Sequence, residues 1–390
     1  KGDLSTARYV PVEKTTSTIT SADIKASGEV AQLPAGAIGA AVGTTAMHQS
    51  YSDEFDARSV AGDVFGNSGS SGGGQRNAVA LFSELSIPAA KGLEVQLAGR
   101  FDHFSDFGNT FNPKLGILFH ATEDLLLRGS VGTGFKAPLM QDLYAATGNG
   151  FPTFIDFVAC NAEQQAGGAT PSCNPAQYNV TSSGNPGLRE QTSISYNVGS
   201  VYQATNNLAL GADFFLVKTK NVVGIDYGDL TRAELAGINT GNIQINRDAQ
   251  GYLESIVAPL QNLSAQDVSG IDFSVGYNLG RFRFATDHSH LLFFKEEGFP
   301  GTGMRDKLGE NGMPGWRNAT SLTYLPRDNQ SVTATAITIA GHEKAVREQG
   351  NLSNYTSVDL QYVYQTKKIG EFTLGVRNVL GTTPPLDDSN

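Results

Sequence analysis

Hydrophobic and polar residues alternate along most of the chain with a period of two. In the stretch LEVQLAGRFD (93–102), apolar residues occupy one side, and Glu, Gln, Arg and Asp occupy the other. The stretches VSGIDFSVGYNL (268–279) and TSVDLQYVYQ (356–365) repeat the pattern, and no helical period of comparable length competes with it. A period of two places alternate side chains on opposite faces of a β-strand. We therefore predict an all-β protein whose strands have one apolar and one polar face.

The connections between these strands are of two kinds, short and long, which largely alternate. The short turns, rich in Pro, Gly, Asn and Asp, lie at 33–36, 88–92, 121–124, 204–207, around Gly280, 326–329 and 367–370. The long connections are predicted at 52–75, 136–190, 225–265, 298–315 and 342–353, with a brief one at 105–110. Seven short turns imply about 14 strands. Short turns at one end and long loops at the other are typical of a transmembrane antiparallel β-barrel, which we predict as a single domain over residues 1–390.

The order of turns also places the two chain ends. The first and last hairpin turns are both short, so Lys1 and Asn390 are expected on the side of the long loops. Bacterial barrels normally have both termini in the periplasm, on the side of the short turns. We therefore expect at least one strand before Lys1 and one after Asn390, which makes the chain a piece of a larger barrel.

Composition narrows the class of protein further. Only 17% of the residues are charged, 45 are Gly, and the formal net charge is −10. An acidic chain repels phosphate backbones, which excludes a nucleic-acid partner. No apolar run reaches the length of about 18 residues that a transmembrane helix needs. No signal peptide is visible at the start of the chain.

The two cysteines, Cys160 and Cys173, fall in one predicted loop with twelve residues between them. This spacing suits a loop-closing disulfide in an oxidising compartment such as the periplasm or the cell surface. None of the six His residues lies near them, so a metal site there is not expected. Two free thiols are the alternative.

Other chemical motifs are weak. The Gly-rich stretch GNSGSSGGGQ (66–75) lacks the Lys-Ser/Thr of a phosphate-binding loop. His288 and His290 share a face with Phe282 and Phe284, which indicates the lipid side rather than a metal site. The stretch DHSH (287–290) has no nucleophile elbow around its Ser. We predict no catalytic residue, no metal and no cofactor.

Several stretches resemble the TonB-dependent outer-membrane receptor family. LLLRGSVGTGFKAPLMQDLY (125–144) is similar to that family's segment in which a strand ends on Gly-Phe-basic-Ala-Pro. The stretches at 84–117, GNPGLREQTSISYNVG (184–199) and GVRNVLGTTPP (375–385) resemble further family motifs in the same order. The resemblance implies structural roles at the barrel rim for Gly134, Phe135, Pro138, Asn185, Pro186 and Glu190.

The resemblance also implies an architecture and a function. Its members have a barrel of about 22 strands around an N-terminal plug, they lie in the Gram-negative outer membrane, and they import scarce nutrients with energy from the TonB–ExbB–ExbD complex. The chain has no plug, no TonB box and no terminal aromatic strand, so coupling to TonB is expected through a plug that is missing here. Lipid and lipopolysaccharide of the outer membrane are the other expected partners. The cargo remains open between siderophore-bound iron, cobalamin, an oligosaccharide and a peptide.

The long loops carry the residues predicted to bind this cargo. Aromatic rings near the rim suit stacking on a ring-shaped ligand, and charged residues beside them suit its polar groups. The candidates are Phe151, Phe154, Phe157, Asp226, Tyr227, Arg305 and Trp316, with Arg232 beside them. Packing of the loop onto itself is the alternative for the three Phe residues. Alternatives for the whole chain are a passive porin, an outer-membrane barrel enzyme and a soluble β-rich adhesin.

Overall fold

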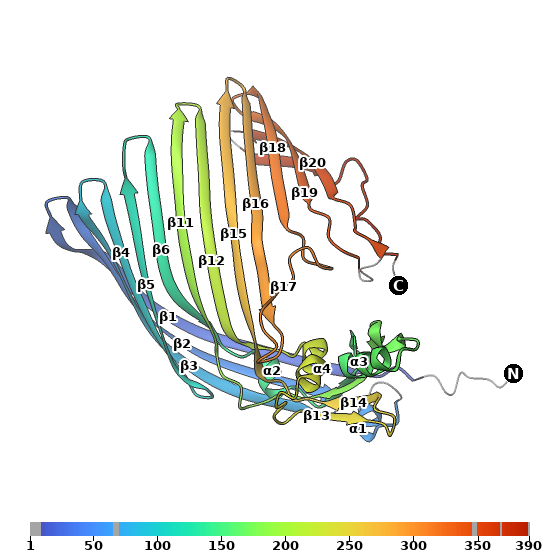
Figure 1. Cartoon of the computed structure of the whole chain (residues 1–390). Coiled ribbons are helices and arrows are strands. Elements are labelled where there is room, and N and C mark those ends of the chain that lie inside the picture. The colour runs from blue at the N-terminus through green and yellow to red at the C-terminus, as the bar shows by residue number, and fades with distance from the viewer. Residues whose placement is uncertain (1–8, 65–69, 345–348, 367–368, 389–390) are drawn as a thin grey trace.

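The computed structural model describes residues 9–64, 70–344, 349–366 and 369–388, and it is dominated by one long curved antiparallel sheet (Figure 1). Within the described residues, fourteen strands follow one another in this sheet in chain order, apart from strands that belong to loops. They are β1 (Glu13–Leu33), β2 (Gly36–Phe55), β3 (Gly72–Ala90), β4 (Leu93–Phe104), β5 (Gly108–His120), β6 (Leu125–Lys136), β11 (Gln191–Thr205), β12 (Leu208–Val223), β15 (Asn262–Leu279), β16 (Phe282–Glu297), β18 (Trp316–Arg327), β19 (Gln330–Ile339), β20 (Tyr355–Thr366) and β21 (Gly370–Val376). This order confirms the predicted all-β fold with antiparallel hairpins.

The turns of the seven hairpins lie at one end of the sheet, and the longer loops lie at the other end (Figure 1). Six of the predicted short turns connect paired strands, and residues 367–368 of the seventh lie outside the described residues. At Gly280 the backbone has φ +57°, a left-handed conformation that glycine adopts without a steric penalty. The strands are longer than predicted, because residues 52–55, 72–75, 136 and 262–265 continue the ladder rather than belonging to loops.

Smaller elements lie within the long loops. They are α1 (Ala57–Ala61), α2 (Met140–Tyr144), β7 (Gly148–Gly150), β8 (Thr153–Phe154), α3 (Phe157–Ala166), η2 (Pro171–Cys173), β9 (Ala176–Gln177), β10 (Asn179–Ser182), α4 (Tyr227–Leu235), β13 (Gln244–Arg247), β14 (Leu253–Val257) and β17 (Arg305–Asp306). Among the described residues, none of the helices combines the length and the apolar character that crossing a membrane requires.

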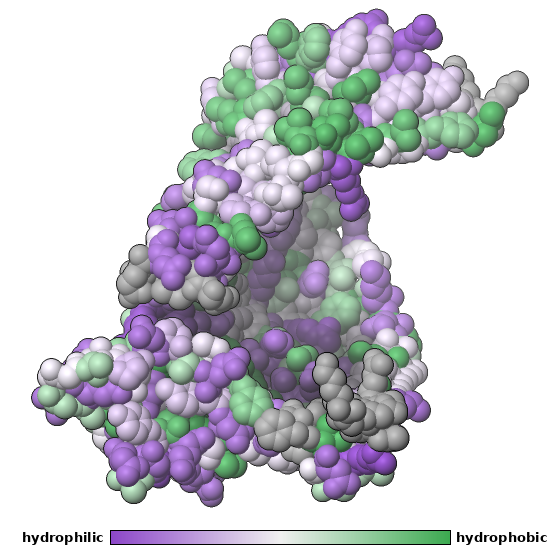
Figure 2. All heavy atoms as spheres, turned by 90° about the vertical axis from the view of Figure 1, so that its right-hand side faces the viewer, coloured by the Kyte–Doolittle hydropathy of each residue, from purple (hydrophilic) through white to green (hydrophobic). Residues whose placement is uncertain are grey.

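The two faces of the curved sheet differ in polarity, as the period of two predicts. Large apolar side chains on the convex face stand exposed; examples are Val79, Leu81, Leu97, Phe101, Phe111, Ile117, Val198, Phe214, Phe273 and Leu322. Figure 2 looks into the open side of the sheet, where hydrophilic residues line much of the hollow. An exposed apolar belt around a polar interior is the arrangement of a barrel surrounded by lipid.

Ion pairs lie on the concave face of the sheet. Arg128 of β6 donates from Nε to Asp213 of β12 at 2.8 Å, and β11 runs between these two strands. At the crossing point stands Gly199, where a Cβ atom would overlap the Asp213 carboxylate. Arg100 and Asp102 pair along β4, with Nη2 and Oδ1 2.9 Å apart. A wet lumen accounts for these charges on the inner face.

Two clusters of buried apolar side chains lie at the loop end of the molecule. One cluster contains Phe154, Val180, Leu230, Ala233, Ile243, Leu253, Ile256, Ala258 and Phe299. A second contains Tyr51, Met140, Leu143 and Leu188, and it attaches α2 to the barrel wall. The loops therefore have a small hydrophobic core of their own.

Candidate functional site

Two long loops, 137–190 and 224–261, form one structural unit that we call the loop layer. Its centre is a four-stranded sheet in the order β13, β14, β10, β7. The strands β10 and β14 pair in parallel, which joins the two loops through backbone hydrogen bonds. The loop layer lies at the end of the barrel opposite the hairpin turns (Figure 1).

Two short helices in the loop layer begin in the same way. Asp156 caps α3 by accepting from the amides of Val158 and Ala159 at 3.2 and 3.4 Å, and Asp226 caps α4 by accepting from the amide of Asp229 at 3.0 Å. An aspartate in this position satisfies free N–H groups of the first helical turn. Each helix follows the local sequence Ile-Asp-aromatic, which places an aromatic ring at its first residue.

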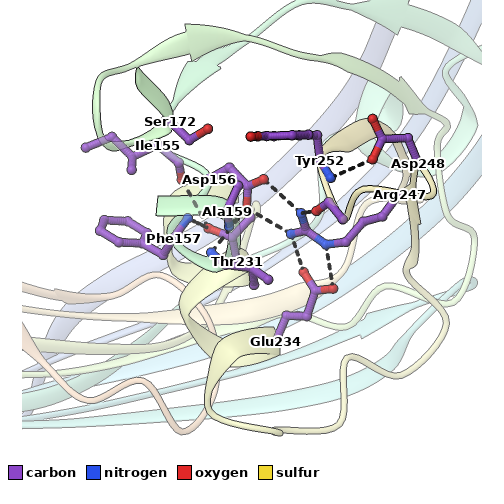
Figure 3. A network of polar contacts seen from close by, with 12 residues as sticks. Ile155, Asp156, Phe157, Ala159, Ser172, Thr231, Glu234, Arg247, Asp248 and Tyr252 are labelled. Atoms are coloured by element: carbon purple, nitrogen blue, oxygen red, sulfur yellow. Dashed lines mark hydrogen bonds and ion pairs between the residues drawn. The ribbon is translucent and has the colours of Figure 1, made fainter. Parts of the chain in front are cut away.

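Arg247 connects the two helices (Figure 3). Its guanidinium donates to Asp156 at 2.8 and 2.9 Å, to Glu234 of α4 at 2.9 and 2.8 Å, and to the Gly251 carbonyl at 2.9 Å. Burial alone would lower the pKa of Arg247, but its hydrogen bonds to Glu234 and Asp156 outweigh burial and raise the pKa. The side chain of Asp156 is only 1% exposed. This network fixes α3 against α4 and the β13–β14 hairpin.

A disulfide between Cys160 and Cys173 ties α3 to η2, which confirms the predicted bridge. The segment also carries hydrogen bonds from Ser172 to Glu163 at 2.8 and 3.0 Å. Phe157 at the start of α3 donates its amide to Thr231 Oγ1 of α4 at 3.2 Å. The start of α3 is therefore held from two sides.

Beside this network, two arginines approach the same buried carboxylate. Asp229 is fully buried, and its Oδ1 lies 2.7 Å from Arg305 Nη2 and 3.7 Å from Arg232 Nε. The Arg232 guanidinium carbon lies 3.7 Å from the centre of the Phe157 ring, a cation–π contact. Burial and the neighbouring Arg305 lower the pKa of Arg232. We call Arg232 and Arg305 the arginine pair.

The protein does not satisfy every hydrogen-bond donor of the arginine pair within the described residues. Among the described residues, the Nε atoms of both arginines are buried without a hydrogen-bond partner. The two side chains as a whole are nevertheless 42% and 34% exposed. Asp226 and Glu310 also act electrostatically on Arg232, so the two guanidinium groups have three carboxylates around them, beside the Phe157 ring.

A second ion cluster links the loop layer to the end of β16. Lys307 Nζ lies 3.0 Å from Asp226 and 3.5 Å from Glu296, near the end of β16. Burial alone would raise the pKa of Asp226, but the Asp229 amide and Lys307 outweigh it, so its pKa is lowered. Gly298 donates its amide to Asp229 at 3.1 Å, and a Cβ atom there would overlap Asp226. The loop 298–315 therefore closes tightly onto α4.

The structure brings together five of the seven residues predicted to bind cargo. Phe154 packs against Tyr227 with ring centres 5.5 Å apart, and both belong to or touch the core of the loop layer. Asp226 and Arg305 contact Asp229, and Phe157 contacts the neighbouring Arg232. The structure places two predicted residues elsewhere: Phe151 is exposed, and Trp316 at the start of β18 stacks on His288 of β16.

The sequence analysis missed Asp156, Asp229, Glu234, Arg247 and Lys307. A usable signal existed for Asp156, because aspartate before an apolar run is a typical helix N-cap. The partners of Arg247 had no signal, since its contact with Asp156 joins residues 91 positions apart.

The residues of the rim motifs mostly anchor loops to the barrel. The carbonyl of Pro138 accepts from buried Arg76 at 2.9 Å, and Arg76 also pairs with Asp106 at 3.4 Å. Phe135 packs edge-on against Phe104 with ring centres 5.8 Å apart. Gly134 lies in β6, where a Cβ atom would stand 3.1 Å from Ser193 Oγ.

The return of the 137–190 loop is fixed by Asn185. Its side chain donates to the Leu260 carbonyl and accepts from the Gly187 amide, both at 2.8 Å. Pro186 beside it is exposed, and Glu190 is partly buried just before β11. Across the described ranges, no group of three or more His, Cys, Asp or Glu residues is placed to hold a metal ion.

Comparison with known proteins bears on this arrangement. The family model described as TonB dependent receptor-like, beta-barrel matches residues 4–379. A variant of the ferric enterobactin receptor PfeA from Pseudomonas aeruginosa, solved with enterobactin, superimposes with a TM-score of 0.66 at 16% identity, covering 94% of this chain and 49% of that one. The siderophore receptor PirA from Acinetobacter baumannii gives 0.62 at 14% identity, covering 94% and 51%.

The ferric yersiniabactin uptake receptor FyuA from Yersinia pestis gives a TM-score of 0.54 at 12% identity, covering 95% of this chain and 50% of that one. The chain thus spans about half the length of these solved structures. A search of curated protein sequences finds no match. At sequence identities of 12–16%, this similarity shows a shared fold and nothing more.

Proposed function

Since the chain belongs to the TonB-dependent receptor β-barrel family of the outer membrane, we propose that it forms the wall and ligand-capturing loops of a receptor that imports a ferric siderophore. In this proposal the loop layer captures the iron complex at the cell surface. A plug inside the complete barrel gates passage, and the TonB–ExbB–ExbD complex supplies the energy. The family and its structural neighbours are transport receptors, and no covalent chemistry is needed.

The observation that carries the proposal is the arginine pair above Phe157. Ferric complexes of catecholate chelators are anionic and expose aromatic rings. Guanidinium groups bind such oxygens through charge-assisted hydrogen bonds, and they also stack on rings. The side chains of Arg232 and Arg305 are partly exposed at the loop end of the barrel, while their Nε atoms are buried and have no hydrogen-bond partner among the described residues. The neighbours PfeA, PirA and FyuA are all named as receptors for siderophores or their ferric complexes, which agrees with this cargo.

The proposal is tested by measuring binding and uptake of a radiolabelled ferric tris-catecholate by the full-length receptor in cells that lack other iron receptors. Arg232→Ala and Arg305→Ala are each expected to weaken binding about tenfold or more, because each removes a charge-assisted contact of about 1.5–3 kcal/mol. Arg283→Ala is the matched control, since Arg283 lies in β16 beside the hairpin turns, away from the loop layer.

The outcomes separate the proposed cargo from the alternatives. Uptake should saturate and should cease in cells without TonB, whereas a passive porin would show neither behaviour. If the receptor takes up cobalamin, an oligosaccharide or a peptide and does not bind the ferric complex, the proposed cargo is wrong although the transport class stands. If both arginine variants bind like the control, the arginine pair is not the capture site.

A further inference from the structure

The sheet contains a hollow at the end with the hairpin turns, opposite the loop layer. It crosses the neighbouring strands β16, β18, β19 and β20, and its volume is about 520 Å³. Gly280 and Asp328, which line it, belong to two hairpin turns, and Leu325 and Val363 contribute apolar side chains. We call this hollow the trough. The short turns of an outer-membrane barrel lie on the periplasmic side, so the trough lies at the periplasmic mouth of the barrel.

The alternation of β16 places the trough on the inner face of the sheet. Phe282 and Phe284 are exposed on the apolar outer face, so Arg283 between them points toward the lumen. Arg283 pairs in register with Thr323 of β18, and both residues line the trough. The trough therefore belongs to the wet interior of the barrel and not to the surface that meets lipid.

Arg283 differs from the paired arginines of the inner face. Arg100 and Arg128 each bond an aspartate, at 2.9 and 2.8 Å. Arg283 is exposed, and within the described ranges it has neither a hydrogen bond nor an ion pair. Among the residues that line the trough, the one carboxylate belongs to Asp328 in the turn. The guanidinium of Arg283 is therefore available to a partner from outside.

Arg281 shapes the same side of the trough. Its Nη1 donates to the carbonyl of Leu325 at 3.2 Å and to the carbonyl of Pro326. These bonds tie the turn before β16 to the end of β18, and they use part of the Arg281 guanidinium. Arg283 is thus the more accessible of the two cations.

The other side of the trough presents side-chain amides. Asn329 donates to the Gln365 carbonyl at 3.1 Å, and Gln365 donates to the Glu371 carboxylate at 3.0 Å. The amide oxygens of Asn329 and Gln365 remain as acceptors. Glu371 adds negative charge beyond β20, so the charge along the trough changes from positive at β16 to negative at β21. An acidic group is therefore favoured at the β16 side.

The dimensions of the trough fit a short extended stretch of polypeptide. Four neighbouring strands about 4.8 Å apart span about 14 Å, which is the length of about four extended residues. A stretch of this length places a carboxylate at Arg283, an apolar side chain on Leu325 and Val363, and its backbone N–H groups near the amide oxygens. A small anion would use only the first of these contacts.

We propose that the trough is a docking site for an extended acidic segment of a polypeptide that approaches the barrel from the periplasm. Arg283 binds a carboxylate of the segment through a charge-assisted hydrogen bond, and the amides of Asn329 and Gln365 accept from its backbone. The inference is independent of the proposed cargo, because the trough and the loop layer lie at opposite ends of the barrel (Figure 1). Arg283 accordingly has no part in capture of the cargo.

The site is tested with the purified full-length receptor in detergent, by fluorescence anisotropy of a labelled hexapeptide in which Glu and Val alternate. The wild type is expected to bind one peptide per barrel, and more weakly at high salt because the contact is between charges. Arg283→Ala is expected to weaken binding about tenfold.

Arg317→Ala is the matched control. Arg317 lies on the inner face of β18 in register with Ser289, outside the trough, and within the described residues it likewise has no ion pair. This variant should bind the peptide like the wild type. Equal affinity of the Arg283 and Arg317 variants would overturn the proposal.

A second pair of variants tests the space itself. Ser331→Trp places a large ring in the trough and is expected to abolish peptide binding. Ser357→Trp is its control, since Ser357 lies on the inner face of β20 in register with Ile337, outside the trough. Heat-modifiable migration on gels verifies that each variant is folded. Undiminished binding by folded Ser331→Trp would contradict the trough as the site.

Two further probes identify the chemistry of the ligand. A hexapeptide with Lys in place of Glu is expected not to bind, and inorganic phosphate is expected not to displace the acidic peptide at equal concentration. Displacement by phosphate would mean a site for small anions, and tight binding of the Lys peptide would mean a site without charge selectivity; either result contradicts the proposal. A full-length receptor that does not bind the acidic peptide would show that the trough is closed to a separate polypeptide, and the proposal would be wrong.

Discussion

The barrel wall and the loop layer bury their side chains according to opposite rules. In the wall, apolar side chains face outward, and Val79 and Phe273 are 53% and 47% exposed. In the loop layer, Leu230 and Ile256 are fully buried around a small core, and charged groups are paired beside it. The same chain therefore contains a region adapted to hydrocarbon and a region adapted to water. The position of the apolar side chains depends on the solvent that each region meets.

Among the substitutions that distinguish the two regions, the loss of a buried charged residue in the loop layer is expected to cost the most stability. Arg247→Ala leaves Asp156 buried without its cation, which costs about 3–5 kcal/mol. Hydrogen exchange should show strong loss of protection in α3, α4 and the β13–β14 hairpin, while heat-modifiable migration of the barrel stays normal.

Lys218→Ala is the matched control for this change. Lys218 pairs with Asp267 at 3.6 Å, but its side chain is half exposed, so its loss should cost about 0–1 kcal/mol. Unchanged protection of α3 in Arg247→Ala would show that the network does not hold the loop layer.

An intermediate effect is expected when a charge is placed on the outward face of the wall. Phe273→Lys puts an ammonium group in the middle of the apolar belt of β15, which costs about 2–4 kcal/mol. Ser274→Lys, one residue further and facing the lumen, should be nearly neutral. Unfolding by urea in lipid vesicles measures both free energies, and equal losses would contradict the assignment of the two faces.

The smallest effect is expected from acidification of the loop layer. Asp226 has a lowered pKa in the folded protein, so its contribution to stability is complete above its unfolded pKa of about 4. That contribution is lost as the pH falls further, through the folded pKa. Hydrogen exchange of α4 should therefore rise below about pH 4. Asp226→Asn keeps the helix cap but removes the titrating group, so its exchange should lack this step.

The wall was predictable from sequence because its rule is local. In each strand, apolar and polar residues alternate with a period of two, and each hairpin turn contains a Pro, Gly, Asn or Asp that predicts it. The strand limits at 52–55 and 72–75 were missed, since the ladder there continues through polar and Gly-rich residues that have no apolar face. The disulfide was predictable from the isolation of its two cysteines in one loop.

The loop layer was predictable only in part because its contacts are distant in sequence. The pairing of β10 with β14 joins residues about 76 positions apart, such as Asn179 and Ser255, and no local pattern specifies it. The Arg247 network likewise depends on two loops meeting in space. Phe154 and Tyr227 were identified by their aromatic character, whereas their packing together follows from the fold of both loops.

The parallel pairing of β10 with β14 also limits how such a receptor can be re-engineered or can diversify by recombination. A foreign segment grafted in place of 137–190 alone would lack β10, the strand with which β14 pairs. Exchange of 224–261 alone would likewise remove β14, the partner of β10. Both segments have to be transplanted together, as a single cassette, for the recipient to acquire a donor's specificity.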